Sequence, residues 1–190
     1  MVRIAIVLGS TRPGRVGKAV ADWVYEQAKR RSDAQFELVD VADFGLPLLD
    51  EPFPPSRGKY RNEHTKAWAQ VIASFDGYII VTGEYNHSVP GALKNAIDYV
   101  YQEWNNKAVG FVSYGSAGGT RAVEHLRQIA AELQMADVRA QVSLPLATEF
   151  ENYTTFAPSP LAVQRLGPVF DQVIAWAGAL KTLRPEGENG

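Results

Sequence analysis

One stretch near the start of the chain combines glycines, hydroxyls and arginines in a way that suits an anion. It is Gly9-Ser10-Thr11-Arg12-Pro13-Gly14-Arg15-Val16-Gly17, called here the first loop. It follows the apolar run Ile4–Leu8, which is typical of a buried parallel strand, and precedes a helical pattern from Lys18 to about Arg30. Backbone N–H groups at a helix start are unpaired and partly positive, and arginine forks suit phosphate oxygens. The sequence therefore predicts a phosphate-binding loop.

The first loop matches neither of the two common nucleotide motifs. Arg12 stands where a Walker A loop needs its first glycine, and Ala19 follows Lys18 where that motif needs Ser or Thr. Ser10 and Thr11 after Gly9 break the dinucleotide fingerprint Gly-x-Gly-x-x-Gly. A turn that uses glycine and serine for geometry alone, with Arg12 and Arg15 as solvated charges, is the alternative.

Composition narrows the class of protein. The 190 residues suit one domain, expected over residues 1–183, with a frayed polar tail over residues 184–190. The net charge of −2 favours neither nucleic acid nor an anionic membrane, and no apolar run approaches membrane-spanning length. The chain has no cysteine, which excludes disulfides and thiolate metal sites, and its three histidines do not predict a metal site. We therefore expect a cytoplasmic protein.

Strand and helix patterns alternate along the chain. Further strands are expected at 36–41, 78–82, 108–113 and 138–142, and further helices at 62–75, from 91, at 120–133 and at 161–183. The fifth strand carries Arg139, as an edge strand can. Five strands separated by helices predict an α/β, flavodoxin-like three-layer sandwich with a five-stranded parallel sheet of order 2-1-3-4-5.

Two long connections interrupt the alternation. The proline-rich segment Asp43–Lys59 and the segment Ser143–Pro160 are expected to be loops. They are either solvent-exposed crossings or walls of a substrate site.

Three loops are expected to meet where the central strands end. The second loop, Gly83–Gly91, carries Glu84-Tyr85-Asn86, and the third loop, Tyr114–Gly119, is rich in glycine. Together they offer a phosphate cradle and, some distance away, room for a flat ring. This describes a mononucleotide site, and in a flavodoxin-like fold FMN is the leading candidate.

These residues resemble the NADPH-dependent FMN reductase family, which includes quinone, chromate and azo-dye reductases. The similarity covers roughly residues 3 to 145, through Gly9-Ser10-Thr11-Arg12, Glu84-Tyr85-Asn86-His87, Leu93–Tyr99 and Ser113-Tyr114-Gly115 with Gly118-Gly119. By position, the resemblance implies that the cofactor phosphate is surrounded by Ser10, Arg12, Arg15, Val16 and Gly17. It implies that Glu84, Tyr85, Asn86 and His87 lie along the ribityl chain and ring, and that Ser116, Gly118 and Gly119 approach the other edge of the ring.

The match has open points. Family members usually have proline where this chain has Gly83, and often Ser or Asn where it has Gly17, so we expect a more flexible second loop and one side-chain donor fewer. Tyr85 either contacts the ring or packs against a neighbouring loop or subunit. His87 is expected to be a turn residue rather than a proton donor.

The resemblance implies an FMN-dependent NAD(P)H oxidoreductase, with NADPH or NADH as co-substrate. The chemistry would take place at flavin N5, with no catalytic side chain, and the acceptor would be a quinone, free flavin, azo dye or metal oxyanion. The helix region Gly91–Trp104 would form a homodimer or homotetramer interface, with Tyr99, Tyr101 and Trp104 as anchors. The alternatives are an electron carrier, which the net charge of −2 disfavours, and a regulatory protein that binds a phosphate ligand without flavin.

Overall fold

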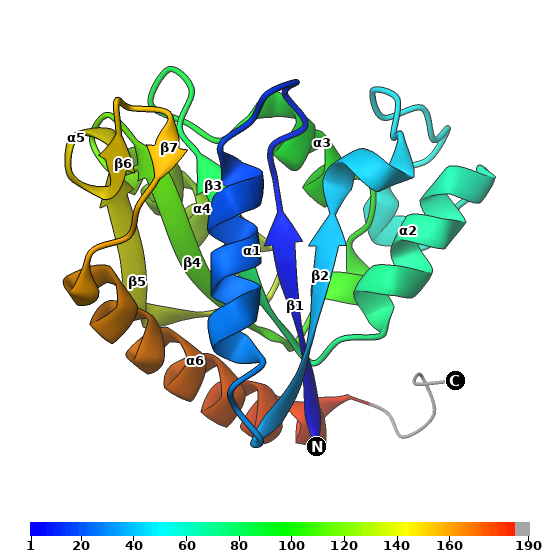
Figure 1. Cartoon of the computed structure of the whole chain (residues 1–190). Coiled ribbons are helices and arrows are strands. Elements are labelled where there is room, and N and C mark those ends of the chain that lie inside the picture. The colour runs from blue at the N-terminus through cyan, green and yellow to red at the C-terminus, as the bar shows by residue number, and fades with distance from the viewer. Residues whose placement is uncertain (185–190) are drawn as a thin grey trace.

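The computed structural model describes residues 1–184. They contain one five-stranded parallel sheet of order β2-β1-β3-β4-β5, with helices on both faces (Figure 1). The predicted α/β flavodoxin-like architecture and strand order are confirmed. The strands are β1 (Val2–Leu8), β2 (Ala34–Asp40), β3 (Gly77–Gly83), β4 (Ala108–Gly115) and β5 (Ala136–Pro145).

The helices follow the predicted alternation. They are α1 (Gly17–Ala28), α2 (Glu63–Ala73), α3 (Gly91–Asp98), α4 (Thr120–Glu132), a single turn α5 (Leu146–Glu149) and α6 (Pro160–Leu180). Short 3₁₀ segments lie at η1 (Val41–Phe44), η2 (Pro55–Arg57), η3 (Gln102–Trp104) and η4 (Lys181–Leu183). Among residues 1–184, no helix combines the length and the apolarity that crossing a membrane requires.

Alternation along each strand divides the core into two layers. In β1, Ile4, Ile6 and Leu8 pack with α1 and α6 on one face, while Ala5 and Val7 pack with α2, α3 and α4 on the other. Figure 1 shows α1 and α6 in front of the sheet. Because both faces are covered, the central strands are almost wholly buried. Only the ends of the strands can present a site.

The first long connection is tied to α3. The Asn95 amide donates to the Pro47 carbonyl at 2.7 Å and accepts from the Leu49 N–H at 3.0 Å. The Tyr99 hydroxyl also donates to the Pro47 carbonyl, at 3.0 Å. The predicted loop Asp43–Lys59 is therefore held in place along α3. It is a loop as expected, and it contains short 3₁₀ segments.

The second long connection is more regular than expected. Strand β5 continues to Pro145, and α5 and a two-stranded hairpin, β6 (Phe150–Glu151) and β7 (Thr155–Phe156), follow it. The prediction of an irregular loop over Ser143–Pro160 is wrong, because this hairpin is anchored by aromatic packing. Phe156 lies 5.1 Å from Phe150 and 5.5 Å from Trp23 of α1, measured between ring centroids.

The end of the described chain is anchored rather than frayed. Arg184, expected to begin the polar tail, donates to the Asp76 carboxylate at 2.5 Å. Asp76 also accepts from the Arg3 backbone N–H at 2.8 Å. Residues 185–190, the rest of the predicted tail, lie outside the described residues.

Candidate functional site

The three loops predicted to form the site come together at the carboxyl edge of the sheet, where the parallel strands end. Arg12 Nε of the first loop donates to the Tyr85 hydroxyl of the second at 3.1 Å. Glu84 of the second loop accepts from the backbone N–H of Arg121, at the start of α4, at 3.2 Å. These contacts link the second loop to the first loop and to the start of α4, across 73 and 37 residues of the chain. Figure 1 shows all three at the upper end of the strands.

The first loop leads into an uncapped helix. Val16, at the N-cap of α1, makes no side-chain hydrogen bond to the first turn, and that turn contains no acidic residue. Ser10 is buried at 2% exposure beneath this turn, whereas Arg12 is exposed. Free N–H groups, a buried hydroxyl and a nearby cation suit the phosphate of FMN.

Arg15 is committed to a partner within the chain. Its Nη1 donates to Asp40 Oδ1 at 2.9 Å, Nη2 contacts the other carboxylate oxygen, and Nη1 also donates to the Ser10 carbonyl. Both side chains are about 15% exposed, and Asp40 additionally accepts from the Ala42 N–H at 2.9 Å. Arg15 therefore shapes the first loop from behind and joins it to the end of β2.

The second loop turns sharply at Asn86 and His87. Tyr85 and Ser88 exchange two backbone hydrogen bonds of 2.9 and 3.0 Å, and the two residues between them have φ of 50° and 69°. This is the pattern of a tight type I′ turn. Gly83 is buried in β3, in register with Tyr114 of β4. The expectation that Gly83 makes this loop flexible does not agree with its place inside a strand.

Arg121 links the second loop to α4 and was not among the residues predicted for the site. Its guanidinium pairs with Glu84, whose side chain is only 6% exposed, and its Nη1 lies 2.8 Å from His87 Nε2. A guanidinium can only donate, so His87 Nε2 is the acceptor and a neutral ring carries its proton on Nδ1. His87 is thus a partnered turn residue in this arrangement.

Two glycines of the third loop stand at positions where a side chain would not fit. Gly118 and Gly119 have φ of 71° and 74°, which disfavours any side chain. A Cβ at Gly119 would also lie 2.7 Å from Ser113 Cβ, and one at Gly118 would overlap the Ser143 hydroxyl. Both glycines are buried, while Ser116 is exposed at the tip of the loop. Of the predicted third-loop contacts, Ser116 is the accessible side chain.

The aromatic residues expected at a subunit interface belong partly to the core. Tyr99 and Trp104 are 0% and 1% exposed, so they cannot act as surface anchors. Trp104 packs edge-on against Trp68 and Tyr78. The helix expected to begin at Gly91 ends at Asp98, and Trp104 lies in a separate 3₁₀ segment.

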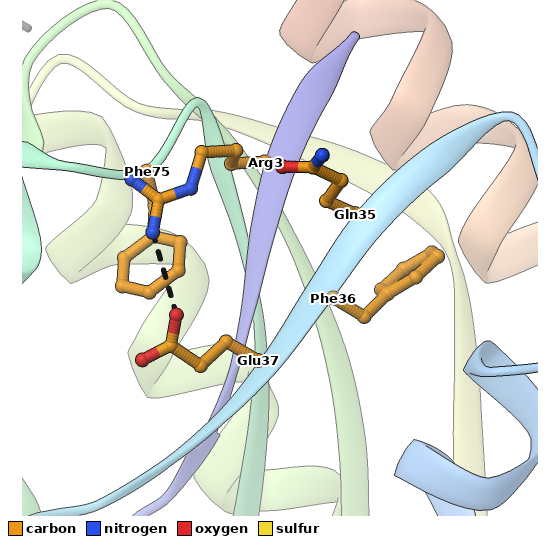
Figure 2. Close-up of a pocket in the computed structure, with 5 residues that line it drawn as sticks. All are labelled: Arg3, Gln35, Phe36, Glu37 and Phe75. Carbon is orange, nitrogen blue, oxygen red and sulfur yellow. Dashed lines mark hydrogen bonds and ion pairs between the residues drawn. The ribbon is translucent and has the colours of Figure 1, made fainter.

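Two hollows help to locate the site. One, of about 380 Å³, lies beside the first loop and is lined by Thr11, η1 with Gly45 and Leu46, and the start of α3 at Ala92 and Asn95. Figure 2 shows another, near the amino ends of β1 and β2, where Arg3 is paired with Glu37 at 3.4 Å and lies over the Phe75 ring. The second hollow offers no uncapped helix start, and its one arginine is already paired, so the carboxyl edge is the better site.

Comparison with known proteins identifies the family of the chain. Residues 2–149 match the family described as NADPH-dependent FMN reductase. An NAD(P)H-dependent FMN reductase of a Nectria species is 42% identical over 154 residues, covering 77% of each chain. A reductase of the same description from Schizosaccharomyces pombe is 40% identical, covering 77% of this chain and 72% of the relative. A quinone reductase of Escherichia coli is 35% identical over 67% of this chain and 69% of its own.

Solved structures support the fold. The flavoenzyme NAD(P)H:(acceptor) oxidoreductase of Paracoccus denitrificans superposes with a TM-score of 0.72 at 20% identity, covering 94% of this chain and 98% of its own.

The fold and the three converging loops define a flavodoxin-like protein with a candidate mononucleotide site at its carboxyl edge. The chain belongs to the NADPH-dependent FMN reductase family. It is accordingly an FMN-dependent NAD(P)H oxidoreductase.

Proposed function

We propose that this chain reduces small acceptors, quinones first among them, with FMN held between the three loops at the carboxyl edge. The observation that carries the proposal is the meeting of these loops, all within the residues that match the family. Relatives named quinone reductase and 2-hydroxy-1,4-benzoquinone reductase support the acceptor class. FMN supplies the redox chemistry, taking a hydride equivalent from NAD(P)H and passing electrons to the acceptor.

In this proposal the first loop binds the tail of the cofactor. The free N–H groups at Val16 and Gly17 and the Ser10 hydroxyl donate to the phosphate, and Arg12 adds positive charge. Arg15 contributes indirectly, because its guanidinium already holds Asp40 and the Ser10 carbonyl.

The second and third loops receive the ring. Tyr85, 45% exposed and held by Arg12, offers an aromatic surface, and the rigid turn presents Asn86 and His87 beside it. Ser116 would meet the opposite edge of the ring, with the Gly118–Gly119 backbone behind it. Glu84 is occupied by Arg121, so its role is to fix the position of the second loop. No side chain is assigned as an essential acid or base.

The assembly and location remain proposals. A homodimer or homotetramer through the Gly91–Trp104 region is supported by an open groove of about 500 Å³ along α3 and α4, lined by Lys94, His125 and Ile129 among others. Light scattering of the purified protein tests it, and a monomeric mass would overturn it.

A cytoplasmic location is proposed because the reaction consumes NAD(P)H.

The decisive experiment is an absorption spectrum of the purified protein followed by steady-state oxidation of NADH and NADPH. We expect a yellow protein whose released flavin is FMN, and NAD(P)H oxidation that depends on added quinone. A colourless protein that does not bind added FMN would contradict the proposed site. A flavin that stays oxidised when NADH or NADPH is added would instead indicate an electron carrier.

A further inference from the structure

One aromatic side chain, Tyr114, reaches from the sheet to the first loop. It is the residue of β4 in register with Gly83 of β3, and it is 8% exposed. A Cβ added at Gly83 would lie 3.2 Å from Tyr114 Cε2 and Cζ. A Cβ added at Gly17 would lie 2.9 Å from Cζ and would overlap the hydroxyl. The phenol therefore runs over Gly83 and ends against the first residue of α1.

The backbone at these two glycines does not itself require glycine. Gly17 begins a regular helix and Gly83 ends a strand, and neither has a positive φ. At Gly17 the space for a side chain is occupied by Tyr114, and at Gly83 a Cβ would make a tight contact of 3.2 Å with the same ring. The two departures from the family pattern, Gly17 and Gly83, thus both lie against one residue.

The Tyr114 hydroxyl lies beside Ser10, whose side chain is near enough to act on it as a hydrogen-bonding group and opposes the rise in its pKa. Burial raises the pKa of Tyr114 and outweighs the opposing effects of Ser10 and of the charges on Arg12 and Arg15. The phenol is therefore protonated at neutral pH and able to donate. Its ring is also held 6.4 Å from Phe150 of the β6–β7 hairpin.

We propose that Tyr114 is a positioning residue for the cofactor phosphate, acting through Ser10. A phosphate oxygen can only accept, so Ser10 must donate its single proton to the phosphate. Ser10 Oγ is then free to accept from Tyr114, and the tyrosine fixes the direction of the serine proton. The hydroxyl of Tyr114 occupies the space that a side chain at position 17 would fill. This inference rests on the proposed FMN site.

The test compares FMN with riboflavin, which lacks the phosphate. Apo-protein is titrated with each flavin, and fluorescence quenching gives the two dissociation constants. Tyr114→Phe keeps the ring and removes only the hydroxyl. We expect it to weaken FMN binding about tenfold and to leave riboflavin binding within about twofold of wild type, since a hydrogen bond that supports a charged acceptor is lost. Tyr153→Phe, at an exposed residue of the hairpin turn, is the matched control and should change neither constant.

Three results would contradict the inference, and they can be told apart. If Tyr114→Phe leaves the dissociation constant for FMN unchanged, the hydroxyl has no role in binding the phosphate. An equal loss for FMN and riboflavin indicates a structural effect on the whole site. A wild-type protein that binds riboflavin as tightly as FMN overturns the proposed phosphate site itself, and the inference with it.

A second measurement tests the shared space without any ligand. Gly17→Ala should lower the melting temperature of the apo-protein by several degrees, because its Cβ meets Tyr114. In a Tyr114→Ala background, Gly17→Ala should leave the melting temperature unchanged. An equal cost in both backgrounds would show that Tyr114 does not fill the space at Gly17.

Discussion

Arg15 and Asp40 form an ion pair that joins the first loop to the neighbouring strand. The two side chains are 16% and 14% exposed, and the contact is bidentate. A guanidinium so engaged has little freedom to turn toward a ligand without leaving a carboxylate buried and unpaired. At the scale of single residues, pairing with Asp40 therefore assigns Arg15 to shaping the first loop rather than to binding a ligand.

This pairing leads to opposite expectations for Asp40. If Arg15 acts by shaping the first loop, Asp40→Asn should weaken FMN binding about three- to tenfold, because the loop loses its support. If Arg15 binds the phosphate, the same change should release the guanidinium and tighten binding. Titration of apo-protein with FMN decides, and tighter binding would contradict the shaping role. Asp43→Asn, at the exposed neighbour in η1, is the matched control.

The sequence located the first loop but not the partner of Arg15. The strand–loop–helix order and the residue types of Gly9–Gly17 predicted an anion site before α1, and the structure has the uncapped helix start there. Asp40 lies 25 residues further along, and its pairing depends on β2 lying beside β1 and on one arginine rotamer. Tyr114 was recognised only as part of the third loop, and its contact with Gly17 was not predicted because it is a tertiary contact.

At the scale of elements, the turn after β3 is a tightly constrained part of the site. Asn86 and His87 both adopt left-handed backbone conformations within two hydrogen bonds. Asparagine accepts this conformation more readily than most residues, and glycine accepts it without cost. The turn holds Tyr85 and Glu84 at fixed positions beside the first loop and α4.

Replacing Asn86 by alanine should therefore lower the stability of the protein more than replacing it by glycine. We expect Asn86→Ala to lower the free energy of unfolding by about 1 kcal/mol and Asn86→Gly to change it little, since only alanine pays the left-handed penalty. Urea denaturation of the two apo-proteins measures the difference. Equal stability of both variants would mean that the turn does not keep its type I′ geometry in solution.

The β6–β7 hairpin shows why one element could not be predicted. Its strands have two residues each, too short for any alternation of apolar and polar residues to be recognised. Its turn uses Asn152 and Tyr153, at φ of 50° and 60°, without the glycine that usually signals such a turn. What stabilises it is packing of Phe150 and Phe156 against Tyr114 and Trp23, which only the folded chain reveals.

At the scale of the whole molecule, strand order was predictable because right-handed crossovers and five alternating units leave few arrangements. The end of the sheet opposite the site is held by Asp76, which is 3% exposed. Its carboxylate accepts from the Arg3 N–H and the Arg184 guanidinium, and it pairs with Lys181 at 3.3 Å. Burial alone would raise the pKa of Asp76, but these donors together lower it.

Asp76 should therefore contribute to stability at neutral pH and not in acid. A carboxylate whose folded pKa lies below its unfolded value, about 3.9, stabilises the protein above that pH and loses the effect as pH falls through the folded pKa. We expect Asp76→Asn to cost about 2–3 kcal/mol of unfolding free energy at pH 7, with the difference from wild type shrinking below about pH 4. Urea titrations across this range measure it, and a difference independent of pH would contradict the ionic role.

The contacts of Asp76 also bring the two ends of the described chain together. Residues 3 and 184 share one carboxylate. The N-terminus lies at the end of the sheet opposite the three loops (Figure 1). A tether attached at Met1, which is exposed, would leave the proposed flavin site facing away from its support. The geometry thus favours oriented immobilisation on a bead or an electrode, with the acceptor side open to solution.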